Sequence, residues 1–157
     1  MILITISTGA FPRLVKEMDR IAPSLREKVV MQIGNTAFEP KNCEFVRVVS
    51  RAKMEFLFKE ASLIVTHAGA GSIIMALSNA KPCVVVPRLK EFSEQIDDHQ
   101  IEIAEGFSLR KNVVVVKEIS ELAGAIKKAR TLSGTNKKSK LIKEIDQYLS
   151  KCKAGFE

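Results

Sequence analysis

Residues that mark specialised folds are scarce in this chain, whose 157 residues include 3 Cys, 5 Pro, 8 Gly and no Trp. So little proline and glycine argues against collagen-like repeats and long disorder. The cysteines are odd in number, are scattered at Cys43, Cys83 and Cys152, and have no histidine neighbours. That pattern argues against a disulfide scaffold and against a zinc site.

Long apolar runs are missing too. No stretch reaches the roughly 18–20 apolar residues that a membrane-spanning helix needs, and Met1–Ser7 is too short for a signal peptide and lacks its basic start. The remaining composition, 46% hydrophobic and 27% charged, is that of a globular domain. We therefore expect one cytoplasmic domain, and a second domain would have to come from another chain.

Excess charge of one sign is almost absent from the body of the chain. Residues 1–126 hold 16 Lys and Arg against 15 Asp and Glu, whereas residues 127–157 hold 9 against 3. A nucleic-acid-binding face needs a basic stripe with stacking aromatics, but aromatics are 6% of the chain. We therefore expect no nucleic-acid partner. The basic tail suits an anionic lipid surface or an acidic partner, or it is a solvated charged helix end.

Short apolar, β-branched runs alternate with helical patterns along the chain. Strands are predicted at Ile2–Ser7, Lys28–Ile33, Phe45–Val49, Leu63–Thr66, Cys83–Val86 and Val113–Lys117. Helices are predicted at Pro12–Ile21, Ala52–Glu60, Glu94–Glu105, Ile119–Ala129 and between Ser72 and Asn79. Continuous apolar strands are buried on both faces, as in parallel sheets. The sequence therefore predicts an α/β fold, a Rossmann-like doubly wound parallel sheet of about six strands.

The segment Thr66–Ser72 lies between a predicted strand and a predicted helix. In a doubly wound sheet, ligands bind at the carboxyl ends of the strands, near the point where the strand order reverses. Gly69 and Gly71 let the backbone approach a phosphate closely, and the first amides of a helix donate to anions. Two interpretations stay open here: a phosphate site, or a tight turn in which Ser72 is an ordinary helix N-cap.

Two common nucleotide-binding motifs are absent. The dinucleotide fingerprint follows the first strand and needs a third glycine, but Ile74 occupies that place. No acidic residue ends the next strand about 20 residues further on, and no Gly-Lys-Ser/Thr of a P-loop follows. A generic Rossmann oxidoreductase and a P-loop protein are therefore disfavoured.

Three segments, in order, carry a resemblance to a known family. They are Ile64–Leu77 (IVTHAGAGSIIMAL), Lys81–Pro87 (KPCVVVP) and Asp98–Ala104 (DHQIEIA), the last followed by Gly106. The set resembles the donor-sugar half of GT-B glycosyltransferases. It is similar to the catalytic subunits of two-part dolichol-pyrophosphate GlcNAc transferases, to PssE-type exopolysaccharide subunits and to the C-terminal half of MurG. The match extends to Ser7–Gly9 and Gln32–Gly34, so it spans most of the chain.

The resemblance implies a single GT-B half, with a UDP-sugar as substrate and no separate cofactor. It implies that His67, Gly69, Gly71 and Ser72 bind the donor diphosphate, that Asp98, His99 and Gln100 bind the sugar, and that Ser7, Thr8 and Gly9 form a candidate acceptor or phosphate loop. Amides and a helix end aimed at the leaving diphosphate would stabilise its growing charge without a metal. The structural alternatives are a satisfied histidine at the strand end and a polar helix face at 98–100.

The adjacent carboxylates Asp97 and Asp98 are not expected to bind a metal. The two residues are consecutive in the sequence and both fall within the predicted helix. Adjacent side chains on a helix point about 100° apart, so they converge poorly on one cation. We expect no metal.

One position departs from the family pattern. Family members usually carry a glutamate seven residues before Pro82, where it binds the ribose hydroxyls, but here that nucleoside-binding position is Met75. A thioether is a weak acceptor and cannot hold a diol as a carboxylate does. The departure predicts weaker nucleoside binding, a substitute group, or loss of donor binding.

The resemblance also implies how the chain would work. Residues 1–130 would form a UDP-sugar-binding domain of a hexosyltransferase-type enzyme that extends a lipid-linked glycan acceptor. A separate, membrane-associated subunit would bind the acceptor, so the chain would be peripheral to the membrane and active only in complex. No general base is assigned, because the acceptor half often provides it. The alternative is a non-catalytic nucleotide-sugar-binding or scaffolding subunit of another glycosyltransferase, which Met75 favours.

Residues 131–157 are predicted to form a basic C-terminal helix after a short linker. Its apolar residues repeat along a single helical stripe, at Leu141, Ile142, Ile145, Tyr148, Leu149 and Cys152. Two roles are open for this helix. It belongs to the same domain and packs on the sheet, or it docks to the partner while its lysines face anionic lipid.

Overall fold

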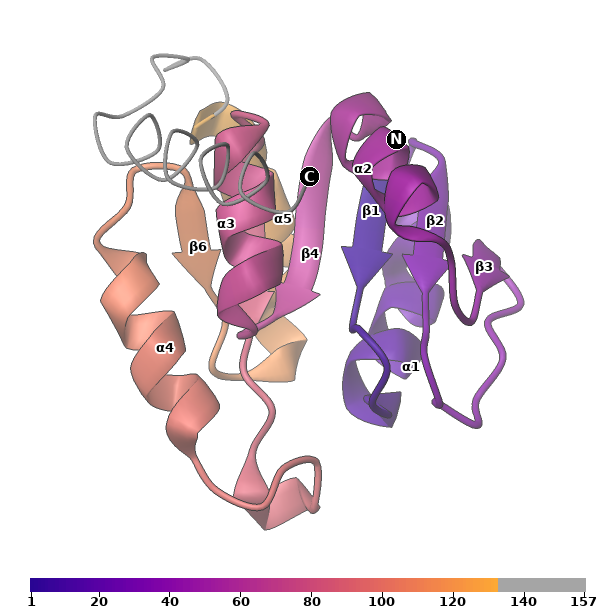
Figure 1. The fold of residues 1–157 in the computed structure, drawn as a ribbon. Helices are drawn as coiled ribbons and strands as arrows, with labels where there is room; N and C mark the ends of the chain where they lie inside the picture. Colours follow the sequence, from indigo (N-terminus) through magenta and orange to yellow (C-terminus); the bar gives the residue numbers. More distant parts are fainter. Residues whose placement is uncertain (133–157) are drawn as a thin grey trace, which may run out of the picture.

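Strands and helices alternate, except between β2 and β3, along residues 1–132, which are the residues that the computed structural model describes (Figure 1). The strands are β1 (Ile2–Thr5), β2 (Val29–Gln32), β3 (Glu44–Val46), β4 (Leu63–His67), β5 (Cys83–Val86) and β6 (Val113–Val115). The α-helices are α1 (Pro12–Ile21), α2 (Arg51–Glu60), α3 (Ala70–Ser78), α4 (His99–Ser108) and α5 (Leu122–Thr131). Short 3-10 turns lie at Ala22–Leu25, Lys90–Phe92 and Ile119–Glu121.

The described strands form one sheet in the order β3-β2-β1-β4-β5-β6. Every neighbouring pair is parallel, and Ile4 of β1 lies opposite Met31 of β2 and Val65 of β4. The chain starts in the middle of the sheet, winds outwards to β3, and then winds the other way to β6. This is the doubly wound order of Rossmann folds, so the predicted α/β fold class and its six parallel strands are confirmed.

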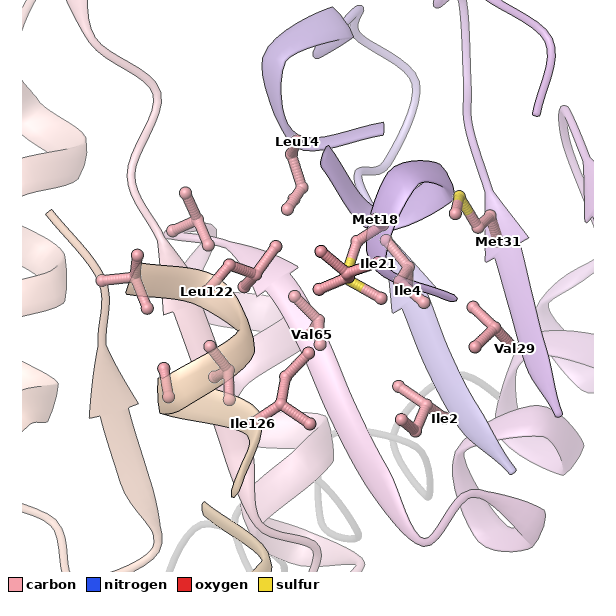
Figure 2. Close-up of a cluster of buried hydrophobic side chains, with 14 of the residues drawn as sticks. Ile2, Ile4, Leu14, Met18, Ile21, Val29, Met31, Val65, Leu122 and Ile126 are labelled. Atoms are coloured by element: carbon pink, nitrogen blue, oxygen red, sulfur yellow. The ribbon is translucent and has the colours of Figure 1, made fainter. Parts of the chain in front are cut away.

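Helices cover both faces of the sheet, and the alternation of side chains along each strand divides the core in two. On one face Ile2 and Ile4 pack with α1 and α5, while on the other face Leu3 packs with α2, α3 and α4. Figure 2 shows the first cluster, in which Leu14 of α1 and Ile126 of α5 lie over the strands. Burial of both faces explains why the central strands carry continuous apolar runs.

Two elements begin and end at the predicted residues. α1 begins at Pro12, because the first helical position has no need of the N–H that proline lacks. β5 occupies Cys83–Val86 between two prolines, which cannot donate to the hydrogen-bond ladder. β1 is shorter than predicted and ends at Thr5, because Ser7 takes a left-handed φ of 61°.

The predicted fourth helix is displaced along the chain: α4 spans His99–Ser108 rather than Glu94–Glu105. Ser93 adopts a left-handed φ of 54°, which breaks a helical path. The Glu94 carboxylate is drawn out of the helix by the Arg13 guanidinium, which donates to it twice at 2.9 and 2.8 Å. Gly106 lies inside this helix, where a glycine costs only about 1 kcal/mol.

The predicted domain boundary near residue 130 and the basic helix at 131–157 stay predictions. Residues 133–157, which include the predicted apolar stripe, lie outside the part of the chain that the structure describes. Within residues 1–132, no helix is both long and apolar enough to cross a bilayer.

The carboxyl ends of the strands all lie at one edge of the sheet, because every pair is parallel. This is the lower edge in Figure 1, where the starts of α3 and α4 and the loop before α4 also lie. The strand order reverses between β1 and β4, so the segments that follow these two strands flank the switch point. Ligands of doubly wound sheets bind there.

Candidate functional site

The loop after β1 is held by the end of β2. The buried Gln32 donates from Nε2 to Ser7 O and to Arg47 O at 2.7 Å each. Its Oε1 accepts from the Thr5 hydroxyl at 2.8 Å. A buried amide with its hydrogen bonds satisfied fixes the backbone that it contacts. Gln32 therefore holds the exposed Ser7–Gly9 loop at the edge of the sheet.

Gly34 supports the same loop from the turn after β2. Its φ is +49°, and a Cβ on it would lie 2.6 Å from Gly9 O and 2.9 Å from the carbonyl carbon of Thr8. The neighbouring Asn35 N–H donates to Thr8 O at 3.2 Å. Only glycine allows both this backbone and this close approach. In the Gln32–Gly34 motif, the Gln32 side chain thus holds the Ser7–Gly9 loop by a hydrogen bond, and Gly34 leaves room for the loop because it has no side chain.

We expect Gly34→Ala to lower the free energy of unfolding by about 2 kcal/mol, because a left-handed backbone costs a residue with a Cβ roughly 1–2 kcal/mol and the methyl also meets the loop. Denaturant unfolding measures the change. Gly106→Ala is the control, since in the described part of the chain no atom outside the backbone of α4 and its chain neighbours lies within 4 Å of its Cβ position. It should stabilise the fold by roughly 0.5–1 kcal/mol. A Gly34→Ala variant as stable as wild type would contradict this role.

The glycine loop after β4 passes directly into α3. Gly69 is the N-cap, with an extended backbone, and the helix begins at Ala70. Glycine is itself accepted at the N-cap, so the interpretation of Ser72 as the N-cap is wrong, and Ser72 lies in the first turn. In the described residues the N–H groups of Ala70 and Gly71 have no backbone partner. α3 therefore presents free amides and its positive dipole end at the switch point.

His67 ends β4 and is 7% exposed. Its ring packs against Gly69, where a Cβ would lie 2.9 Å from the His67 Cε1 atom. The pKa of His67 is lowered from 6.5 to about 4: burial is the largest cause, the charge of Arg88 acts in the same direction, and a hydrogen bond with the Thr5 backbone opposes both. His67 is therefore neutral at pH 7 and carries a single ring N–H, which its hydrogen bond to the Thr5 backbone uses.

A pocket of about 450 Å³ opens between the loop after β1 and the start of α3. Its polar lining residues are Thr5, Ser7, Thr8, Gln32, Arg51 and Ser72, and the others are Val48, Val49, Met54, Phe58, Gly71 and Met75. The volume lies within the ~300–1,000 Å³ that is usual for small-ligand sites. The structure thus brings Ser7 and Thr8 of the first loop, Gly71 and Ser72 of the glycine loop, and Met75 into one pocket, whereas Gly9, His67 and Gly69 are not among its lining residues.

The predicted sugar-binding residues lie at the start of α4 and do not line this pocket. Asp98 and His99 are exposed: the Asp98 carboxylate accepts a backbone N–H of the preceding loop at 3.1 Å, and His99 Nδ1 lies 3.3 Å from a carboxylate of its own helix. Gln100 is buried, and its Oε1 accepts from the Arg88 N–H at 3.0 Å. Gln100 therefore connects α4 to the end of β5.

Asp97 and Asp98 precede α4, so the helical geometry predicted for this pair is wrong. Asp97 accepts the His99 N–H at 3.2 Å, and Asp98 is the N-cap residue. Within residues 1–132, no three His, Cys, Asp or Glu side chains lie close enough together to hold a metal ion. Burial raises the pKa of the Cys43 and Cys83 thiols to about 12, so both are protonated at pH 7.

Arg88 is the main residue of this edge that the sequence patterns did not indicate. It follows β5, is 6% exposed, and donates from Nη2 to Ile6 O at 2.8 Å. Its guanidinium lies 5.2 Å from the centre of the Phe11 ring. A charged residue is seldom buried without a partner. The only signal in the sequence that Arg88 is buried was its position directly after a buried strand and a proline. Arg51, which lines the pocket, was missed as well.

The sequence features of this edge match one protein family. The model of the glycosyltransferase family 28 C-terminal domain matches residues 1–151. The chain belongs to this family. The predicted resemblance to the donor half of GT-B glycosyltransferases is therefore confirmed, and the family 28 assignment covers all the loops described above.

Individual relatives agree with the family 28 assignment. UDP-N-acetylglucosamine transferase subunit ALG13 of Eremothecium gossypii is 34% identical over 92 residues, which cover 57% of this chain and 43% of that protein. A solution structure of ALG13 has a TM-score of 0.58 at 17% identity, covering 83% of this chain and 85% of that chain. The crystal structure of Acinetobacter baumannii MurG has a TM-score of 0.60 at 16% identity, covering 96% and 49%. The two structures show a shared fold, and the chain spans less than half of the curated relative.

Proposed function

We propose that this family 28 domain is the donor subunit of a hexosyltransferase. It binds a UDP-sugar and transfers the sugar to a lipid-linked glycan acceptor that a separate, membrane-associated subunit holds. The main support is the pocket of about 450 Å³ in which the loop after β1 and the first turn of α3 meet at the switch point of the sheet. UDP-N-acetylglucosamine is the donor in the name of ALG13 and is our first choice of substrate.

The donor diphosphate is proposed to bind at the start of α3. The Ala70 and Gly71 amides are free to donate, the Ser72 residue lines the pocket, and the neutral His67 ring lies beside them against Gly69. Negative charge grows on the diphosphate as its bond to the anomeric carbon breaks. Hydrogen-bond donors that the fold already holds in place therefore stabilise the transition state more than the ground state.

The nucleoside is proposed to occupy the apolar part of the pocket. Val48 and Val49 after β3, Phe58 of α2 and Met75 of α3 form apolar walls, and Arg51 contributes a positive charge to the described lining. Apolar walls with a few polar groups are typical of small-molecule sites. In this arrangement the flat base packs against the apolar walls, and the diphosphate points toward the polar residues at the start of α3.

The sugar is proposed to meet the start of α4. Asp98 and His99 are exposed there and can accept or donate hydrogen bonds to hydroxyl groups. The Gln100 carbonyl oxygen is already engaged by the Arg88 backbone, so this residue contributes its amide or positions the loop.

The acceptor half is proposed to lie in another protein, because a GT-B enzyme needs two Rossmann-like halves and the relative ALG13 is named as a subunit of its transferase. The test compares the purified chain with a complex that contains a candidate membrane-associated partner, using UDP-N-acetylglucosamine and other UDP-sugars with a lipid-linked acceptor. Transfer by the complex but not by the purified chain supports the proposal. Strong transfer by the purified chain contradicts the need for a second subunit. In calorimetry UDP should bind and NAD should not.

A non-catalytic nucleotide-sugar-binding or scaffolding subunit is the second candidate, and Met75 favours it. Met75 lines the pocket at the position where the family usually has a ribose-binding glutamate. A thioether contributes little to binding a diol. UDP-sugar binding without transfer, even in the complex, would support this second function.

We expect Met75→Glu to tighten UDP binding by about tenfold, because hydrogen bonds to a charged group contribute roughly 1.5–3 kcal/mol and partial burial of the carboxylate offsets some of this. Calorimetry with UDP measures the change. Met75→Gln is the uncharged control of the same shape and should gain less. If the folded Met75→Glu variant binds UDP no better than wild type, the ribose does not lie at residue 75 or another group already holds it.

A further inference from the structure

Arg88 is a buried cation with few partners. Its side chain is 6% exposed, and within residues 1–132 its guanidinium makes one hydrogen bond, from Nη2 to Ile6 O. The buried Nε has no partner in this part of the chain. Arginine has five N–H donors, and buried polar groups are normally paired. The guanidinium is therefore held in place with most of its donors unused.

The negative charge near Arg88 is shared with a second arginine. The Glu94 carboxylate accepts two hydrogen bonds from Arg13, at 2.9 and 2.8 Å, and a third from Leu89 N at 3.1 Å. Burial lowers the pKa of Arg88, and the charge of Glu94 offsets only part of this effect. Arg13, Arg88 and Glu94 together therefore carry one positive charge that no carboxylate in the cluster balances.

Arg88 lies next to the first loop of the proposed diphosphate site without lining the pocket itself. On one side it faces Gly9, where a Cβ would lie 3.1 Å from Nη2 and 3.5 Å from Nη1. On the other side its charge acts on His67 at the end of β4. Its own backbone N–H is fixed by Gln100 of α4 at 3.0 Å. The ends of β1, β4 and β5 thus meet around this cation.

We propose that Arg88 is an anion-binding residue of the donor site, whose charge holds the diphosphate of the UDP-sugar between the Ser7–Gly9 loop and the start of α3. The inference rests on the proposed function. A diphosphate supplies the negative charge that the cluster of Arg13, Arg88 and Glu94 lacks. The attraction is strong because water screens a buried charge less than an exposed one.

Calorimetry of wild type and Arg88→Met with uridine, UMP and UDP tests this role. We expect UDP binding to weaken by roughly tenfold or more and uridine binding to stay within about twofold, with UMP between them, because the effect follows the phosphate charge. Arg88→Lys keeps the charge and should recover most of the UDP affinity. Arg20→Met is the matched control, because Arg20 is an exposed α1 residue paired with Glu17 at 2.7 Å. It should bind all three ligands as wild type does.

Equal losses for uridine and UDP would assign Arg88 to packing and overturn the proposal, and so would an unchanged UDP affinity. If Arg88→Met does not fold by circular dichroism, Arg88→Gln is measured by the same criteria. Failure of both to fold would make Arg88 a structural residue and also overturn the proposal.

Inorganic pyrophosphate separates this inference from the proposed function. Wild type that binds pyrophosphate through Arg88 but does not bind UDP would keep the anion site and overturn the donor function. If wild type and Arg88→Met bind UDP equally well, the donor function is kept and the role of Arg88 is overturned. Wild type that binds neither ligand would overturn both.

Discussion

Gly71→Val is expected to weaken UDP binding by roughly a hundredfold or more, which corresponds to about 3 kcal/mol, while the fold stays intact. Beyond its chain neighbours and its own helix backbone, no atom of residues 1–132 lies within 4 Å of the Cβ position on Gly71, and Gly71 lines the pocket. A valine there stands in the space proposed for the diphosphate and covers the first amides of α3. The loss of UDP affinity has two causes: the valine excludes the diphosphate sterically, and the hydrogen bonds from the α3 amides to the charged diphosphate are lost. Such charge-assisted hydrogen bonds are stronger than neutral ones.

Calorimetry with UDP and thermal unfolding of the same samples measure both halves of this prediction. Gly124→Val is the matched control, because among the described residues the Cβ position of Gly124 is equally open, but Gly124 lies in α5, on the other side of the sheet. This control should bind UDP as wild type does. A folded Gly71→Val variant with wild-type UDP affinity would remove the diphosphate from the start of α3.

The fold could be predicted because its signals are local. A run such as Val84–Val86 has apolar residues on both faces, so it has to be covered by helices on both sides. A proline at the first helical position fixes the start of α1 in the same way. The start of α4 could not be predicted, because Glu94 is drawn from the helix by Arg13, which is 81 residues away in the sequence. Local periodicity carries no information about such a contact.

The candidate site could be predicted in part, for the same reason. The resemblance indicated the first loop and the glycine loop, and the structure brings Ser7 and Ser72 into one pocket. Their roles in binding a donor stay predictions. Arg88 was missed because its burial depends on Ile6, 82 residues away, and on the ring of Phe11. In the sequence this arginine looks like an exposed residue of a charged loop.

Lowering the pH from about 6.5 to about 4 is expected to reduce the free energy of unfolding by about 3 kcal/mol through His67 alone. In the folded chain, burial lowers the pKa of His67 from 6.5 to about 4, whereas the unfolded chain keeps the ordinary value. Between these two values the unfolded state binds a proton that the folded state does not bind. Protons therefore favour unfolding in this window, and the full stability is present only above about pH 6.5.

Denaturant unfolding between pH 4 and pH 7.5 measures this effect in wild type, His67→Gln and His99→Gln. Carboxylates that titrate in the same range contribute to all three proteins, so the difference in pH dependence between wild type and His67→Gln isolates His67. His99→Gln controls for the loss of an imidazole outside the core, because His99 is exposed beside Glu102 at 3.3 Å. The same pH dependence in His67→Gln as in wild type would contradict a buried neutral histidine. A neutral His67 brings no charge, so the positive potential of the proposed donor site has to come from the start of α3 and from Arg88.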